Sequence, residues 1–112
     1  MKKVGILLFI IFLSCTKVDL MRDVPECIEV KIREFAKSES ICDSGSEVNE
    51  YRFQDQTVYT FSQGNCGYDL QTGIYDSDCN ELGGLGGFVG NTDINGENFD
   101  SNAVFISKIW GN

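Results

Sequence analysis

The sequence contains no histidine, a single proline, and only 9 Lys and Arg residues against 17 Asp and Glu residues in 112 positions. Without histidine, the chain cannot assemble a Ser-His-Asp or Cys-His catalytic set, and it has no imidazole ligand for a metal. The formal charge of -8 argues against nucleic-acid binding, because contacts with phosphates require a basic patch. We therefore expect one domain with no enzymatic activity, no cofactor, no metal and no nucleic-acid partner.

The sequence also lacks an apolar run long enough to cross a bilayer as a helix, which needs roughly 20 residues. Its longest run covers residues 4–13 and follows Lys2 and Lys3. A short apolar run behind a positively charged start is typical of a secretory signal peptide, so these residues take no part in the fold.

The run ends at Ser14-Cys15. This ending resembles the bacterial lipobox, in which a small residue precedes a cysteine that is diacylated and becomes the first residue of the mature protein. We expect residues 1–14 to be a lipoprotein signal peptide and residues 15–22 to be a lipidated tether. The protein would then lie in the bacterial cell envelope, anchored by the lipid on Cys15, at the outer rather than the inner membrane. The alternative is a plain secretory signal, with Cys15 incidental.

No Cys-x-x-Cys motif occurs among the other four cysteines, which argues against a redox or zinc site. An even number of cysteines in a small exported chain predicts two disulfides, for which three pairings are open. We favour Cys66–Cys79 across a hairpin and Cys27–Cys42 along the first helix. A few extended residues returning beside a short helix can cover its length.

Hydrophobic spacing predicts a helix over residues 24–38, with one apolar stripe that packs in the core. Asp23 is a candidate cap for this helix. Pro25 suits its first turn, where a missing N–H costs little.

Runs rich in β-branched and aromatic residues, separated by polar turns, predict the strands of a sheet. The first two form a hairpin. A helix followed by about four strands predicts an α+β domain over residues 23–112, with the helix packed on an antiparallel sheet. The expected strands cover residues 48–53, 57–61, 70–76 and 103–110.

Residues 83–96 are rich in glycine but contain no G-x-G-x-x-G and no Gly-Lys-Ser/Thr, so we expect no nucleotide binding. The pattern predicts a loop that requires positive φ or close packing. Within it, Leu85 and Phe88 either anchor the loop to the core or form an exposed tip for a partner. The candidate partner-binding residues of this segment are Leu85, Phe88, Asp93, Asn95 and Glu97.

Two stretches, Asp76-x-Asp78-x-Asn80 and Asp93-x-Asn95-x-Glu97, have oxygen-bearing side chains at the first, third and fifth positions, a spacing that suits Ca²⁺. Neither stretch has the glycine that an EF-hand needs at its sixth position. We interpret both as acidic turns rather than metal sites.

Acidic residues are concentrated in residues 39–107, which hold twelve of them and a single basic residue, Arg52. This charge either provides solubility or attracts a basic protein partner.

Several short motifs recur together in one order along the chain: Cys15, Cys27-Ile28, Tyr51-x-Phe53, Thr57-Val58-Tyr59, Asn65-Cys66, Tyr75-Asp76-x-Asp78-Cys79-Asn80 and Gly87-Phe88-Val89-Gly90. Over residues 27–110, this order resembles a family of small, uncharacterised bacterial lipoproteins described as a domain of unknown function. The resemblance implies a location in the cell envelope and no established activity, and it assigns no catalytic residue.

The sequence thus predicts a non-enzymatic, lipid-anchored envelope protein that acts as a binding or structural module. One alternative is an inhibitor of a basic secreted enzyme, such as a lysozyme or a protease. The other is a cell-surface accessory protein for glycan or nutrient capture, for which an exposed Trp110 or Tyr68 would serve.

Overall fold

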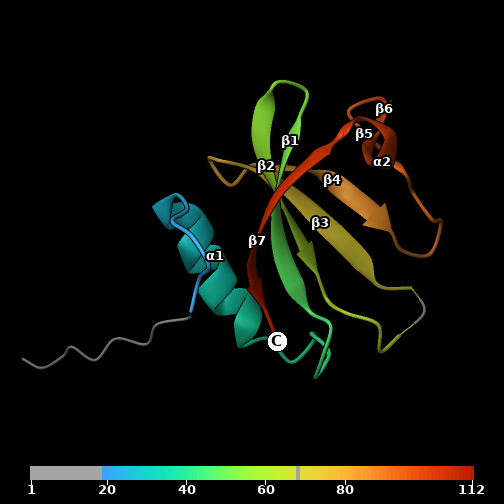
Figure 1. Ribbon diagram of the computed structural model, residues 1–112. Coiled ribbons are helices and arrows are strands. Elements are labelled where there is room, and N and C mark those ends of the chain that lie inside the picture. The colour runs from blue at the N-terminus through green and yellow to red at the C-terminus, as the bar shows by residue number, and fades with distance from the viewer. Residues whose placement is uncertain (1–18, 68) are drawn as a thin grey trace, which may run out of the picture.

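The computed structural model describes residues 19–67 and 69–112, and Figure 1 shows how they are arranged. The predicted signal peptide, Cys15 and Tyr68 lie outside the described residues. Within the described part of the chain, no helix combines the length and the hydrophobicity that crossing a bilayer requires.

One helix packs on a five-stranded antiparallel sheet, which confirms the α+β fold expected from the sequence. The helix α1 spans Glu26–Ala36. The sheet has the order β4-β3-β2-β1-β7 and consists of β1 (Glu47–Phe53), β2 (Gln56–Ser62), β3 (Gln71–Asp76), β4 (Glu81–Gly86) and β7 (Val104–Gly111). A small second sheet pairs β5 (Asp93–Ile94) with β6 (Glu97–Asn98), and a short helix, α2 (Phe99–Asn102), follows it.

The sheet has one strand more than expected because β4 includes the first glycines of a segment that the sequence predicts to be a loop. β4 pairs with β3, and Gly83 and Gly84 lie opposite Ile74 and Gly73. Backbone hydrogen bonds to a neighbouring strand need no side chain, so a glycine-rich stretch can complete a sheet when its partner strand is already in place.

The helix is shorter than the predicted 24–38, and Asp23 does not cap it. Pro25 occupies the N-cap position, no side chain caps the helix, and the Pro25 carbonyl oxygen accepts the N–H groups of Ile28 and Glu29, both at 3.0 Å. A residue that precedes proline is disfavoured in the helical conformation, so Val24 stays outside the helix.

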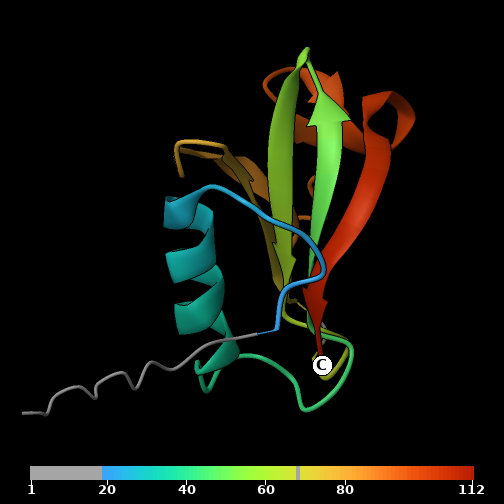
Figure 2. The same ribbon diagram turned by 60° about the vertical axis from the view of Figure 1, so that its left-hand side comes forward.

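The two sides of the sheet carry separate hydrophobic clusters, because successive side chains of a strand point to opposite sides. Figure 2 shows α1 standing along one side. The cluster between α1 and the sheet contains Ile28 and Ile32 of α1 together with Val48, Tyr59, Phe61 and Ile109 of the sheet. The second cluster contains Phe53, Val58, Ile74, Ile94 and Phe99.

The disulfides join Cys27 to Cys79 and Cys42 to Cys66, with Cα–Cα distances of 6.2 and 5.6 Å. The expected number of two disulfides is confirmed, but the favoured pairing of Cys27 with Cys42 and of Cys66 with Cys79 is wrong. Because α1 lies across the sheet, its first turn is beside the turn that follows β3, and Cys27 Sγ lies 3.4 Å from the Ser77 carbonyl oxygen.

At the other end of α1, the chain turns back toward the end of β2. The Cys42 N–H donates to the Gln63 carbonyl oxygen at 2.8 Å. This bond places Cys42 next to the segment that leads to Cys66. Each disulfide therefore links the α1 region to the sheet, rather than closing a local loop.

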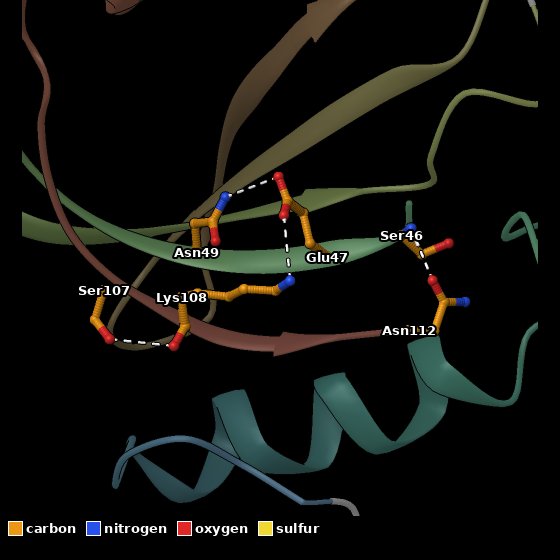
Figure 3. A network of polar contacts seen from close by, with 6 residues as sticks. All are labelled: Ser46, Glu47, Asn49, Ser107, Lys108 and Asn112. Atoms are coloured by element: carbon orange, nitrogen blue, oxygen red, sulfur yellow. Dashed lines mark hydrogen bonds and ion pairs between the residues drawn. The ribbon is translucent and has the colours of Figure 1, made fainter. Parts of the chain in front are cut away.

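Asn112 fixes the end of β7 to the start of β1, as Figure 3 shows. Its Oδ1 accepts the Ser46 N–H at 2.9 Å. Its Nδ2 donates to the Cys42 carbonyl oxygen at 2.9 Å. Nearby, Lys108 Nζ lies 3.9 Å from Glu47 Oε1. The buried Ser46 is thus held between Cys42, which precedes β1, and Asn112, which follows β7.

Candidate functional site

The turn after β4, residues 87–90, presents two exposed apolar side chains. Phe88 is 87% exposed and Val89 is 82% exposed. Asn91 closes the turn, because its N–H donates to the Gly86 carbonyl oxygen at 3.0 Å and its carbonyl accepts the Gly86 N–H at 2.8 Å. We call residues 87–90 the glycine tip.

Glycines give this tip its shape. Gly86, Gly87 and Gly90 have φ angles of 77°, 75° and 66°, in the left-handed region that residues with a Cβ rarely adopt. A backbone closed in this way presents Phe88 and Val89 on a defined turn.

The structure places Leu85 and Phe88 in different environments. Leu85 is in β4 and packs against the second hydrophobic cluster, whereas Phe88 projects from the tip. The two roles considered from the sequence are thus divided between them, with Leu85 as the anchor and Phe88 as the exposed side chain.

Asp93, Asn95 and Glu97 lie in the β5–β6 hairpin, which Figure 1 shows beside α2. Asn95 Nδ2 donates to Gln54 Oε1 at 3.2 Å, and Gln54 Nε2 donates to Glu97 Oε1 at 2.8 Å. These bonds hold the hairpin against the β1–β2 turn. Asn95 and Glu97 are therefore engaged with Gln54, and Asp93 is exposed.

The other oxygen-rich stretch is a turn closed by Asp76. Its Oδ1 accepts the N–H groups of Asp78 and Asn80, both at 2.9 Å, and its Oδ2 accepts Asn80 Nδ2 at 3.1 Å. Desolvation opposes a lowered pKa for Asp76, but the hydrogen bonds from Asn80 and Asp78 outweigh it and hold the pKa below its ordinary value. Within the described residues, no group of three or more acidic or cysteine side chains is placed to hold a metal ion.

A groove of about 450 Å³ lies between α1 and the outer strands β3 and β4. We call it the α1–β3 groove. Its aromatic lining comes from Phe35, Phe61 and Tyr75, and its charged lining from Lys31, Glu34 and Glu81.

The groove lies where α1 does not cover the sheet. Gly73 and Gly84 are directly opposite each other on β3 and β4 and supply no side chains at this point. Lys31 Nζ lies 4.4 Å from the centroid of the Tyr75 ring, and the same ring packs edge to face on Phe61 at 5.4 Å. Burial, and then the charge of Glu81, raise the pKa of the Tyr75 hydroxyl above its ordinary value.

The sequence does not predict this groove, because its residues come from α1, β2, β3 and β4 and have no common spacing. The available signal was a glycine inside a predicted strand, Gly73, since such a glycine often marks a close approach to the backbone.

Gln71 connects the groove to the glycine tip. It lines the groove, and its side chain lies across Gly84. Its Nε2 atom lies 3.6 Å from the position that a Cβ on Gly87 would occupy. The groove and the tip are therefore neighbouring parts of one surface.

Trp110 does not form an exposed platform. It is partly buried against the cluster under α1, with its ring 6.0 Å from that of Phe35. A separate exposed apolar segment lies on the edge strand β7, where Val104, Phe105 and Ile106 are exposed.

The family model for a domain of unknown function, DUF6970, matches residues 34–112. No curated protein and no solved structure matches the chain.

Proposed function

The chain belongs to the DUF6970 family, a domain of unknown function, and from this premise we propose that it is a non-enzymatic binding module anchored in the bacterial cell envelope by a lipid on Cys15. The finer assignment, a bacterial lipoprotein with a cleaved signal peptide, rests on the sequence of residues 1–15. The two disulfides support it indirectly, because they use the other four cysteines and leave Cys15 for another role.

The observation that carries the binding role is the exposure of Phe88 and Val89 on the glycine tip, at 87% and 82%. Two large apolar side chains that are exposed to water would gain hydrophobic stabilisation if a partner covered them. The tip presents them on a backbone closed by paired hydrogen bonds between Gly86 and Asn91. A preorganised apolar turn of this kind lowers the entropy cost of binding.

Charge indicates the kind of partner. Residues 39–107, which include the tip, carry twelve acidic residues and one basic residue. A surface of this sign attracts a basic protein and raises its rate of association at low salt. The tip and the charge together favour one specific form of the proposal, an inhibitor of a basic secreted enzyme. The glycan-capture alternative receives no support from Trp110, because its ring packs on Phe35.

The first experiment measures the intact mass of the native protein isolated from membranes, before and after reduction and alkylation. The proposal predicts a chain that begins at Cys15 with added acyl mass, and four cysteines that are alkylated only after reduction. A chain without acyl mass would remove the lipid anchor from the proposal.

The second experiment measures binding to a panel of basic secreted enzymes at low salt. We expect binding that weakens when Phe88 and Val89 are both changed to Ser, and that weakens with salt. Val104→Ser serves as the control, because it removes an exposed apolar side chain from β7, outside the tip. Absence of binding to every member of the panel, or equal binding by the tip variant, would contradict the proposal.

A further inference from the structure

The α1–β3 groove has a composition that suits a positively charged group. Three aromatic rings and two carboxylates line it, and a single basic side chain, Lys31, stands among them. Among the described residues, neither Glu34 nor Glu81 has an ion-pair partner, and both are exposed. The lining therefore carries more negative than positive charge.

The groove already holds a cation in the free protein. The ammonium group of Lys31 lies 4.4 Å from the centroid of the Tyr75 ring, which is within the range of a cation–π interaction. This side chain is a flexible tether from α1, and its ammonium can move into water at little cost. The position that it occupies marks where a positive group is stabilised.

The floor of the groove allows close approach. An added Cβ on Gly73 would lie 3.0 Å from Tyr75 Cε1, so the Tyr75 ring lies against the backbone of β3. One side of the ring thus faces the sheet, and Lys31 shows that a cation can reach the ring.

From these observations we propose that the α1–β3 groove binds a lysine or arginine side chain of a protein partner, with its charged group over Tyr75 in place of Lys31 and neutralised by Glu34 and Glu81. The proposal rests on the proposed binding of a basic partner and specifies one part of that contact. Because Gln71 links the groove to the glycine tip, one partner that covers Phe88 can reach the groove at the same time.

The test uses acetyl-arginine amide as the probe and acetyl-citrulline amide as its uncharged control. Amide proton–nitrogen spectra of the oxidised protein are recorded at low salt with increasing amounts of each compound. We expect the signals of Gly73, Tyr75 and Glu81 to shift with the arginine compound and not with the citrulline compound.

Three variants on exposed or partly exposed positions separate the contributions without disturbing the core. Glu34→Gln and Glu81→Gln should each lower the affinity for the arginine compound by about threefold, because each removes one attractive charge. Glu29→Gln makes the same change of charge on α1 outside the groove and should leave the affinity unchanged.

Lys31→Met provides a result of the opposite sign. It keeps an apolar stem but removes the ammonium group that competes for the Tyr75 ring. We expect it to bind the arginine compound about threefold more tightly than the native protein. A purely structural role for Lys31 would instead leave the affinity unchanged or lower it.

The proposal is overturned if both compounds shift the same signals, if no groove signal shifts, or if Lys31→Met leaves the affinity for the arginine compound unchanged or lowers it. These outcomes differ from failure of the proposed function. If basic enzymes bind through Phe88 and Val89 while the groove is silent, the groove proposal fails and the binding role stands. If the arginine compound binds in the groove as expected while no basic enzyme binds, the groove proposal stands and the proposed function fails.

Discussion

Gly73 of β3 lies directly opposite Gly84 of β4, and neither residue supplies a side chain at this point of the outer sheet. The consequence is local. The Tyr75 ring lies over Gly73 and the Gln71 side chain lies over Gly84, so the aromatic surface and the polar edge of the groove both depend on missing Cβ atoms.

Replacing Gly73 with alanine should therefore lower the stability of the domain more than replacing Gly84 with alanine. In Gly73→Ala the added Cβ would lie 3.0 Å from the Tyr75 ring, which must move, and we expect a loss of about 1 kcal/mol of stability. In Gly84→Ala the Cβ would meet the Gln71 side chain, which is flexible and exposed, so stability should change by less than about 0.5 kcal/mol. Urea unfolding of both variants checks this order, and an equal loss in both would contradict it.

Removing either disulfide should destabilise the domain substantially. Cys27–Cys79 spans 52 residues and Cys42–Cys66 spans 24, and replacing either pair with alanine should cost about 2–4 kcal/mol. Unfolding in urea without reductant gives the loss. Peptide mapping of the unreduced protein tests the pairing, and a fragment that joins Cys27 to Cys42 would show that the pairing in the structure is wrong.

The pH dependence of stability should reveal the Asp76 turn. Its pKa is held below the ordinary value, so as the pH falls the unfolded chain takes up the proton first. The stabilisation is present above the unfolded value of about 3.9 and is lost as the pH falls through the lower, folded value.

Asp76→Asn should remove part of this dependence and give a flatter stability curve below about pH 4. Asp78→Asn is the matched control, because only the backbone N–H of Asp78 takes part in the turn through the bond to Asp76. Thermal unfolding across the acidic range compares the two, and identical curves for both variants would argue against Asp76 as the acceptor.

Asn112→Ala should destabilise the closure between β7 and β1. It removes the acceptor for the Ser46 N–H and the donor to the Cys42 carbonyl oxygen, and Ser46 is buried. A lost hydrogen bond that leaves a buried group unpaired costs about 1–3 kcal/mol. Hydrogen exchange at Ser46 should accelerate in the variant, whereas unchanged protection there would show that other bonds hold this strand end.

Truncating a core residue should destabilise the domain far more than truncating a residue of the glycine tip. Ile28 of α1 is fully buried, and Ile28→Ala should cost about 2–5 kcal/mol. Phe88→Ala removes a larger side chain that is 87% exposed and should change stability by less than about 0.5 kcal/mol. A large loss in Phe88→Ala would mean that this side chain packs within the domain in solution.

Much of the fold was predictable because it follows from local patterns. The strands β1, β2, β3 and β7 agree with the predicted strands to within one residue at every end. β2 begins at Gln56, so the turn of the β1–β2 hairpin consists of Gln54 and Asp55. Both turn residues have positive φ, 53° and 62°, as a two-residue hairpin turn of type I′ requires. β4 was missed because glycines carry no strand signal of their own.

The sequence alone determined the composition of the surface, the number of disulfides, the helix stripe and the alternation of the strands, because each depends on residue type and short spacing. The tertiary structure decided the disulfide partners, the strand character of β4 and the meeting of Lys31, Glu34, Tyr75 and Glu81 in one groove. These features depend on where α1 crosses the sheet. That position is set by burial of Ile28 and Ile32 against β1, β2 and β7, and no spacing along the chain encodes it.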